Sequence, residues 1–389
     1  MYPTLSDLIR DLFGVDIPLP IQSFGFMLAI SFLAAAWTLQ QELRRKESDG
    51  LLHTIRTEKI IGMPASFTDL AVSFLTGFVI GYKLFYAAFN YSAFVEDTQG
   101  FLLSMEGHLV GGLLVGSAMA FLHYREKEKE RLPHPKTVVE QVHPHQLVSN
   151  ITMVAAISGI IGAKLFHNLE NLHEFSDDPL DALLSFSGLT MYGGLIVGAA
   201  AVMRYGYKRG IHPMILADAT APGLMLAYGT GRLGCQISGD GDWGIVNEAP
   251  APSWLPDWAW AYNYPHNVIN EGVPIPGCDG RHCMVLPDAV FPTPLYEAVA
   301  CILLFFLLWG IRKRFSATGM LFSLYLSLNG IERLLIEQIR VNNKFDLLGM
   351  NVTQAEVIAV TLILLGVSGL YYFLKYPIRH DPGTARKPV

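Results

Sequence analysis

The sequence predicts an all-α protein that crosses a membrane about nine times. Of its 389 residues, 51% are hydrophobic and only 16% are charged, and the mean hydropathy is +0.33. Soluble domains average about 25% charged residues, so this chain has too little polar surface for a protein surrounded by water. Two further observations agree with a membrane protein: apolar stretches of spanning length recur along the chain, and the loops between them alternate in charge.

Nine apolar stretches have, or nearly have, the length of roughly 20 residues that a helix needs to cross a bilayer. The third and fifth are short and rich in glycine, so their ends are the hardest to place. In chain order the stretches are Ile21–Leu39, Phe67–Phe89, His108–Leu122, Val148–Phe166, Leu189–Met203, Met214–Gln236, Pro294–Ile311, Met320–Ile339 and Ala355–Leu374.

The loops that follow the odd-numbered stretches are rich in Lys and Arg, and the loops between them hold few or none. Because basic loops stay in the cytoplasm, this alternation places the N-terminus outside and the C-terminus inside. The long segment 237–292 then lies outside, with Arg281 as its one basic residue and four tryptophans, which favour the membrane interface. We expect a periplasmic arm or cap there. Cys278 and Cys283 fall on this oxidising side, which favours a disulfide, although a metal site with His282 is a second interpretation.

We expect one integral-membrane domain covering residues 1–389, in which the helical hairpin 67–124 repeats the hairpin 148–205. In each copy a lysine (Lys83 or Lys164) precedes a Gly-Gly pair that opens the next helix. The lysines are typical of side chains that reach the headgroup level, and the Gly-Gly pairs are typical of close helix packing. The matching segments are Gly81–Phe85 with Gly162–Phe166, and Gly111–Gly116 with Gly193–Gly198.

Ionisable residues inside the apolar stretches indicate a site. Arg232 lies near the end of the sixth stretch, before a glycine-rich, acidic turn that runs to Gly244. In the eighth stretch Arg333, Glu337 and Arg340 share one helix face. A guanidinium at membrane depth is retained where it has a partner or an aqueous cavity, and arginine is well suited to bidentate phosphate recognition. A snorkelling Arg232 and a purely structural Arg333–Glu337 pair are the alternatives.

These residues resemble the prolipoprotein diacylglyceryl transferases of bacterial inner membranes, over most of the chain. Six motifs carry the resemblance, in the family's order. They are Phe24-Gly25, Tyr192-Gly193-Gly194-Leu195-Ile196, Asp218 to Pro222, Gly231-Arg232-Leu233-Gly234 with Gly239 and Trp243-Gly244, Pro292 to Glu297, and Arg333-x3-Glu337-x2-Arg340.

The resemblance implies transfer of a diacylglyceryl group from phosphatidylglycerol to the lipobox cysteine of a preprolipoprotein signal peptide, with release of glycerol phosphate. It also implies a multi-pass protein of the bacterial cytoplasmic membrane, with bilayer lipids around it and without a cofactor, metal or nucleic acid. The catalytic residues it implies are Arg232, Arg333, Glu337, Tyr192 and Asp240. The substrate-binding residues are Arg232, Arg340, Gly193, Gly194, Asp218, Cys235 and Gly239.

The chain departs from the family's pattern at several positions. Tyr192 stands where some members have His, and Cys235 where many have Asn; either Asp240 or Asp242 replaces a Glu. Phe24 and Asn329 stand where others have Tyr, and the first hairpin has no counterpart in the usual seven-span form. His108, before the first Gly-Gly pair, is either a displaced base or an interfacial histidine.

Two other functions remain open from the sequence. A transporter or channel for an anionic lipid or solute would use the same buried arginines for binding alone. A non-catalytic family member would hold phospholipid without turnover.

Overall fold

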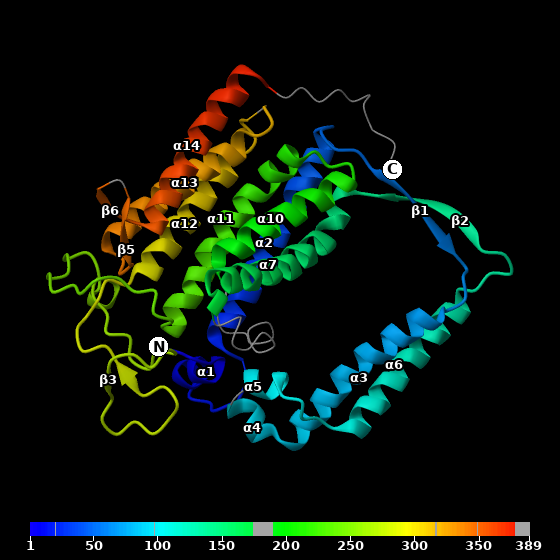
Figure 1. Cartoon of the computed structure of the whole chain (residues 1–389), viewed down its shortest axis with the longest axis horizontal. Helices are drawn as coiled ribbons and strands as arrows, with labels where there is room; N and C mark the ends of the chain where they lie inside the picture. The colour runs from blue at the N-terminus through cyan, green and yellow to red at the C-terminus, as the bar shows by residue number, and fades with distance from the viewer. Residues whose placement is uncertain (20, 97, 174–189, 316, 348, 378–389) are drawn as a thin grey trace. The chain divides into compact units, whose positions relative to one another are not determined.

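A computed structural model of the chain describes residues 1–19, 21–96, 98–173, 190–315, 317–347 and 349–377 (Figure 1). Most of the described elements are helices, and each of the nine apolar stretches lies on one of them. The start of the fifth stretch, Leu189, lies outside the described residues, as do the basic residues at the end of the C-terminal tail. The nine helices are α2 (Ser23–Ser48), α3 (Phe67–Phe89), α6 (Leu109–Lys129), α7 (Val148–Glu170), α10 (Met191–Lys208), α11 (Pro213–Ser238), α12 (Thr293–Ile311), α13 (Met320–Ile336) and α14 (Gln354–Lys375).

Five helices in the described part of the chain are long and apolar enough to cross a membrane. They are α2, α3, α12, α14 and the helical segment Pro144–Glu170, which joins the short 3-10 helix η1 (Pro144–Leu147) to α7. The protein is therefore a mostly helical, multi-pass membrane protein. The full count of nine spans and their orientation remain predictions.

The expectation of an entirely helical chain is incomplete, because three two-stranded sheets are present. Tight turns explain the β5–β6 hairpin: Gly349 has a φ of 82°, and its N–H donates to the Asp346 carboxylate at 3.1 Å. The pairs are β1 (Ile55–Ile61) with β2 (Lys136–Val142), β3 (Val273–Pro274) with β4 (Met284–Val285), and β5 (Lys344–Leu347) with β6 (Met350–Thr353). The short helices α1 (Leu5–Phe13), α4 (Tyr91–Glu96), α5 (Thr98–Leu103), η2 (Asp257–Ala259) and η3 (Glu337–Ile339) complete the described elements.

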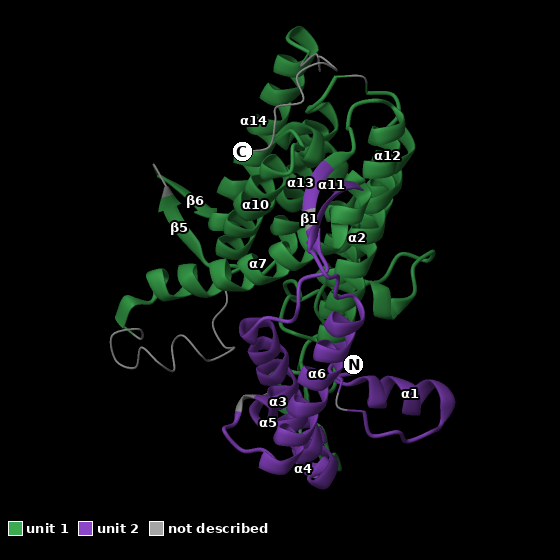
Figure 2. Ribbon diagram, turned by 90° about the vertical axis from the view of Figure 1, so that its right-hand side faces the viewer, with its two compact units in different colours: residues 1, 24–55, 142–389 green, residues 2–23, 56–141 purple. Residues whose placement is uncertain are grey.

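The chain divides into two compact units (Figure 2). The larger unit holds residue 1, residues 24–55 and residues 142–389, and the smaller unit holds residues 2–23 and 56–141. The larger unit is built on α11. One apolar cluster packs α11 with α2, α7 and α10 through residues such as Leu43 and Leu216, and a second packs it with α12 and α13 through Met225 and Leu308. All four side chains are fully buried.

The two predicted hairpin copies, α3–α6 and α7–α10, pack through equivalent glycine contacts. A Cβ added to Gly81 would lie 2.4 Å from the carbonyl oxygen of Gly111, and one added to Gly162 would lie 2.5 Å from that of Gly193. The two helices of each hairpin therefore meet backbone to backbone at the same place. The duplication itself stays a prediction, and residues 174–189 of the second copy lie outside the described residues.

The segment 237–292 has a small core of its own, formed by Trp243, Tyr264, Leu286 and Val290. Cys278 and Cys283 form a disulfide beside the β3–β4 pair, which confirms the first of the two interpretations of this motif. Both sulfurs are used by that bond, so they do not serve as thiolate ligands. Two other tryptophans of the segment are exposed, Trp254 at 80% and Trp258 at 56%.

Candidate functional site

Arg232 lies in the last turns of α11, where the helix emerges from the core. The helix ends at Gly239, which has a φ of 67°, and the chain then turns sharply toward Asp240 and Asp242. A left-handed residue is needed at this cap, and glycine adopts that conformation without steric cost. Arg232 is only 8% exposed. A guanidinium so buried requires anionic partners, and two carboxylates supply them.

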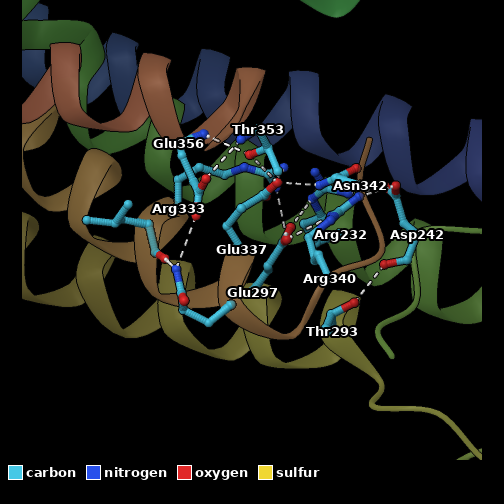
Figure 3. Close-up of polar contacts among 12 residues, drawn as sticks. Arg232, Asp242, Thr293, Glu297, Arg333, Glu337, Arg340, Asn342, Thr353 and Glu356 are labelled. Atoms are coloured by element: carbon cyan, nitrogen blue, oxygen red, sulfur yellow. Dashed lines mark hydrogen bonds and ion pairs between the residues drawn. The ribbon is translucent and has the colours of Figure 1, made fainter. Parts of the chain in front are cut away.

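Glu297, in the first turns of α12, is the centre of the site (Figure 3). Its side chain is fully buried. Its Oε2 atom accepts the Nε–H of Arg232 and, at 3.2 Å, the hydroxyl of Tyr228. Its Oε1 atom lies 2.9 Å from Nη1 of Arg340 and 3.3 Å from Nη1 of Arg333. One carboxylate thus holds three arginines, of which Arg232 comes from α11 and Arg333 and Arg340 come from the segment 333–340 about a hundred residues later.

Asp242 is the second shared carboxylate. It pairs with Nη1 of Arg232 and, at 2.5 Å, with Nη2 of Arg340. The backbone around it is fixed: the Thr293 hydroxyl donates to the Asp242 carbonyl oxygen at 2.7 Å. Gly244 lies so close to η3 that an added Cβ would be 2.4 Å from the carbonyl oxygen of Ile339. This close approach explains why the turn ends in a glycine.

Glu337 orients the third arginine. Its Oε2 atom lies 2.8 Å from Nη2 of Arg333. Its Oε1 atom accepts hydrogen bonds from Thr353 at 2.7 Å and from Asn342 at 2.5 Å. Thr353 also caps the N-terminus of α14, where its hydroxyl accepts the Glu356 N–H at 3.1 Å. Arg333 is therefore held by a carboxylate that is itself fixed by the neighbouring hairpin and helix.

These six residues form a cluster of three guanidiniums and three carboxylates, which we call the arginine–carboxylate cluster (Arg232, Asp242, Glu297, Arg333, Glu337 and Arg340). At neutral pH its formal charges cancel. Burial alone would raise the pKa of the Asp242 carboxyl, but the attraction of Arg232 and Arg340 outweighs it and holds that pKa below its usual value. Asp242 is therefore ionised. An incoming phosphate would therefore compete with Asp242 and Glu297 for arginines that are already oriented.

Cys235 and Asp240 lie beside this cluster. The Sγ atom of Cys235 is 3.9 Å from Nη1 of Arg232. Together with one carboxylate oxygen each from Asp240 and Asp242, it forms a group whose atoms all lie within 4.8 Å of one another. Burial raises the pKa of Asp240, and its Oδ1 atom is buried without a hydrogen-bond partner. Asp240 therefore differs from Asp242: it is the less acidic carboxyl and lacks an arginine hydrogen bond among the described contacts.

Four other predicted site residues are not members of the arginine–carboxylate cluster: Tyr192, Gly193, Gly194 and Asp218. Gly193 and Gly194 face α7, where added Cβ atoms would meet Phe166 at 2.3 Å and the Gly159 carbonyl oxygen at 2.9 Å. Tyr192, next to them on α10, has no hydrogen bond or ion pair to the arginine–carboxylate cluster in the described structure. The packing interpretation of the Gly-Gly pair therefore has direct support.

Asp218 lies near the opposite end of α11, about 21 Å from Arg232 along a helix that rises about 1.5 Å per residue. Its carboxylate accepts the backbone N–H groups of Gly319 at 2.7 Å and Phe322 at 2.9 Å, at the N-terminus of α13. It also lines a cavity of about 270 Å³ with Lys46. The sequence placed Asp218 among the substrate-binding residues, but the structure puts it at a helix junction outside the cluster.

His108 belongs to the smaller unit, where it caps α6: its Nδ1 accepts the N–H of Gly111 at 3.0 Å. Lys83, in the same unit, donates to the carbonyl oxygens of Phe101 at 2.9 Å and Glu106 at 2.8 Å. Both side chains thus have local structural partners.

Glu297 could not be identified as a site residue from the sequence motifs alone. It was the last residue of the Pro292–Glu297 motif, yet it was not among the predicted catalytic or binding residues. Its position near the start of an apolar helix, without a basic residue nearby in sequence, is a signal that its partners come from elsewhere. Glu332 was missed as well; it is 7% exposed and its Oε2 atom has no hydrogen-bond partner.

The fold and the cluster define a multi-pass membrane protein with a buried network of arginines and carboxylates. The model of the family described as prolipoprotein diacylglyceryl transferase matches residues 135–372, more than half of the chain. This protein belongs to that family.

Relatives of the same description agree. The phosphatidylglycerol–prolipoprotein diacylglyceryl transferase of Corynebacterium diphtheriae is 30% identical over 225 residues, which cover 57% of this chain and 76% of the relative. The protein of that name from Dehalococcoides mccartyi strain 195 is 29% identical over 242 residues, covering 62% and 82%. The one from Corynebacterium glutamicum strain ATCC 13032 is 30% identical over 235 residues, covering 59% and 70%.

Proposed function

We propose that this protein transfers the diacylglyceryl group of phosphatidylglycerol to the thiol of the lipobox cysteine in a prolipoprotein. The names of its relatives state this donor and acceptor class, and the arginine–carboxylate cluster provides a matching site. The observation that carries the proposal is the convergence of Arg232, Arg333 and Arg340 on one buried carboxylate. A phosphodiester headgroup is the anion in the membrane that such a set of oriented guanidiniums suits.

In this reaction the cysteine sulfur attacks the terminal glycerol carbon of the diacylglyceryl group. A C–S bond forms, the C–O bond to phosphate breaks, and the bonding electrons leave with the phosphate oxygen. The thiol proton is first taken up by a base of the protein and is then passed to the released glycerol phosphate. Negative charge grows on the phosphate as the C–O bond breaks, so arginines fixed in advance stabilise the transition state more than the substrate.

In this account Arg232 and Arg340 bind the phosphate. Both are paired with the Asp242 carboxylate in this structure, and the phosphate takes the place of that carboxylate. Arg333 contacts Glu297 as well, and its guanidinium is held in place by Glu337. Asp240 is our proposed acceptor of the thiol proton. Its raised pKa makes it a stronger base than an ordinary aspartate, and its buried Oδ1 atom has no competing hydrogen bond.

The membrane placement completes the proposal. Nine helices cross the bacterial cytoplasmic membrane, with the cluster and the segment 237–292 on the outer side, where signal peptides of exported proteins emerge. The disulfide and the two exposed tryptophans of that segment support this orientation.

The test is a transfer assay with the purified full-length chain in detergent containing phosphatidylglycerol. A lipobox peptide and its Cys-to-Ser version are incubated with the protein, and the peptide mass is followed. We expect one diacylglyceryl addition on the cysteine peptide only.

Arg232→Lys keeps the charge but loses the bidentate geometry, so we expect at least about a hundredfold fall in rate with little change in Tm. Arg314→Lys, at an exposed arginine, is the matched control. Lipid binding without any peptide modification would contradict the transferase and favour transport or simple lipid binding.

A further inference from the structure

A group of side chains that could bind a metal ion lies outside the arginine–carboxylate cluster, at the C-terminal end of α2. Glu47 belongs to the last turn of that helix, and His143 and His145 flank Pro144 at the start of η1. One ligand atom from each of the three residues lies within 4.8 Å of the other two. All three residues belong to the larger unit.

We propose that Glu47, His143 and His145 form a binding site for a zinc ion. Two imidazoles and one carboxylate are a common ligand set for zinc, with a water molecule completing the tetrahedron. The proposal is independent of the transfer reaction.

The distances fit one ion shared by three ligands. Atoms that lie about 2.0–2.1 Å from a tetrahedral zinc ion are separated from each other by about 3.3 Å. Nδ1 of His145 is 3.6 Å from one oxygen of Glu47, and Nδ1 of His143 is 2.7 Å from the other. The first distance is too long for a hydrogen bond, and the second is a normal one. Small side-chain rotations bring both to the spacing of zinc ligands.

The strongest observation concerns His145. Its Nδ1 atom is buried and has no hydrogen-bond partner. A buried polar atom without a partner is costly and is uncommon in folded proteins. The Nδ1 atom of His145 is 3.6 Å from the Glu47 carboxylate, which is beyond hydrogen-bond distance. A metal ion bound between the two would coordinate both groups.

The ligands are also held firmly. Glu47 adjoins the buried Lys46 on a helix whose Leu43 is completely buried. The N–H of His143 donates to the side chain of Gln146 at 2.7 Å, and Leu147 anchors the same turn in the apolar core. His143 is the most exposed ligand, with 48% of its side chain accessible, so an ion can enter from that side. A bound zinc would fasten the end of α2 to the turn before α7.

The proposal is tested by zinc binding to the purified full-length chain, prepared without a histidine tag and stripped with a chelator. Binding is measured by competition with a chromophoric chelator, and the metal is counted by elemental analysis. We expect one zinc ion per chain, a fall in affinity of at least tenfold for His145→Ala and for Glu47→Gln, and no change for His134→Ala. Magnesium, which prefers six oxygen ligands, should not compete.

Two further measurements keep the test decisive. Thermal unfolding of each variant without metal shows whether it is folded, and zinc should raise the Tm of the unmutated chain but not that of His145→Ala. Cobalt in place of zinc reports the ligands: nitrogen and oxygen ligands give no sulfur charge-transfer band, whereas binding at Cys235 and Asp240 does. Unchanged zinc affinity in His145→Ala, absence of saturable binding, or a sulfur band that disappears in Asp240→Asn would each overturn the proposal.

Discussion

At the scale of single residues, the site depends on how one carboxylate is shared. Among the described residues, Glu297 contacts all three arginines of the cluster, whereas Glu337 contacts one arginine, Arg333, and two neutral side chains. Removing one member of a buried ion pair costs about 3–5 kcal/mol, because the partner charge is left uncompensated. The two glutamates should therefore differ in their importance for stability.

We expect Glu297→Gln to lower the Tm more than Glu337→Gln does. Both substitutions keep the size of the side chain and remove one charge, so each is the control for the other. The measurement is thermal unfolding in detergent, followed by tryptophan fluorescence. An equal loss in the two variants would show that Glu297 is not the principal anion of the cluster.

Asp242 should make stability depend on pH in acid. Because its folded-state pKa is lowered, it contributes stability that is fully present above the unfolded value of about 3.9 and is lost as pH falls through the lower folded value. Asp242→Asn should therefore lower the Tm at pH 7, and the difference from the unmutated chain should shrink below about pH 4.

Asp257→Asn, at an exposed position of the same segment, is the control for this experiment. We expect its Tm to follow that of the unmutated chain at every pH. A Tm difference for Asp242→Asn that stays constant from pH 7 to pH 3 would contradict the ion pairing of Asp242.

At the scale of elements, the sequence predicted the helices well and their partners poorly. Residues 67–89 form a helix with the predicted bounds, because Ser66 and Asp69 cap it reciprocally. The helix α6 continues beyond the predicted Leu122 to Lys129, because the apolar run is followed by Glu and Lys, which are good helix formers. The end of an apolar run marks the edge of a membrane stretch and need not end the helix.

The partners of the arginines were harder to predict for a physical reason. The i, i+4 spacing of Arg333 and Glu337 follows from helix geometry and was visible in the sequence. The contacts of Glu297 with Arg232 and Arg340 join three elements that are far apart in the sequence, and no local periodicity encodes such contacts. The catalytic roles assigned from the family resemblance remain proposals.

The glycine contacts of the α7–α10 hairpin give a prediction for packing. Gly162→Ala places a Cβ 2.5 Å from a backbone oxygen of the neighbouring helix, so we expect a destabilisation of about 1–3 kcal/mol. The control is Gly310→Ala in α12, where the added Cβ meets nothing within 4 Å. That change should be neutral or stabilising by up to about 1 kcal/mol. Similar Tm values for the two variants would contradict close backbone packing in the α7–α10 hairpin.

At the scale of the whole molecule, the proposed topology places Asp257 outside the cell and Lys313 in the cytoplasm. The native cysteines give little background, since Cys235 and Cys301 are buried and the other two are joined in a disulfide. A membrane-impermeant maleimide should label Asp257→Cys in intact cells, and Lys313→Cys only after permeabilisation. Labelling of Lys313→Cys in intact cells would contradict the predicted orientation.

The proposed reaction also defines which bond of the lipid breaks, and this gives the most direct test of the central claim. Phosphatidylglycerol labelled in its headgroup glycerol is incubated with the purified protein and the lipobox peptide, and soluble label and modified peptide are both counted. The account predicts one glycerol phosphate released for each diacylglyceryl peptide formed, with no label on the peptide. Release of free glycerol or fatty acid, or label retained on the peptide, would contradict it.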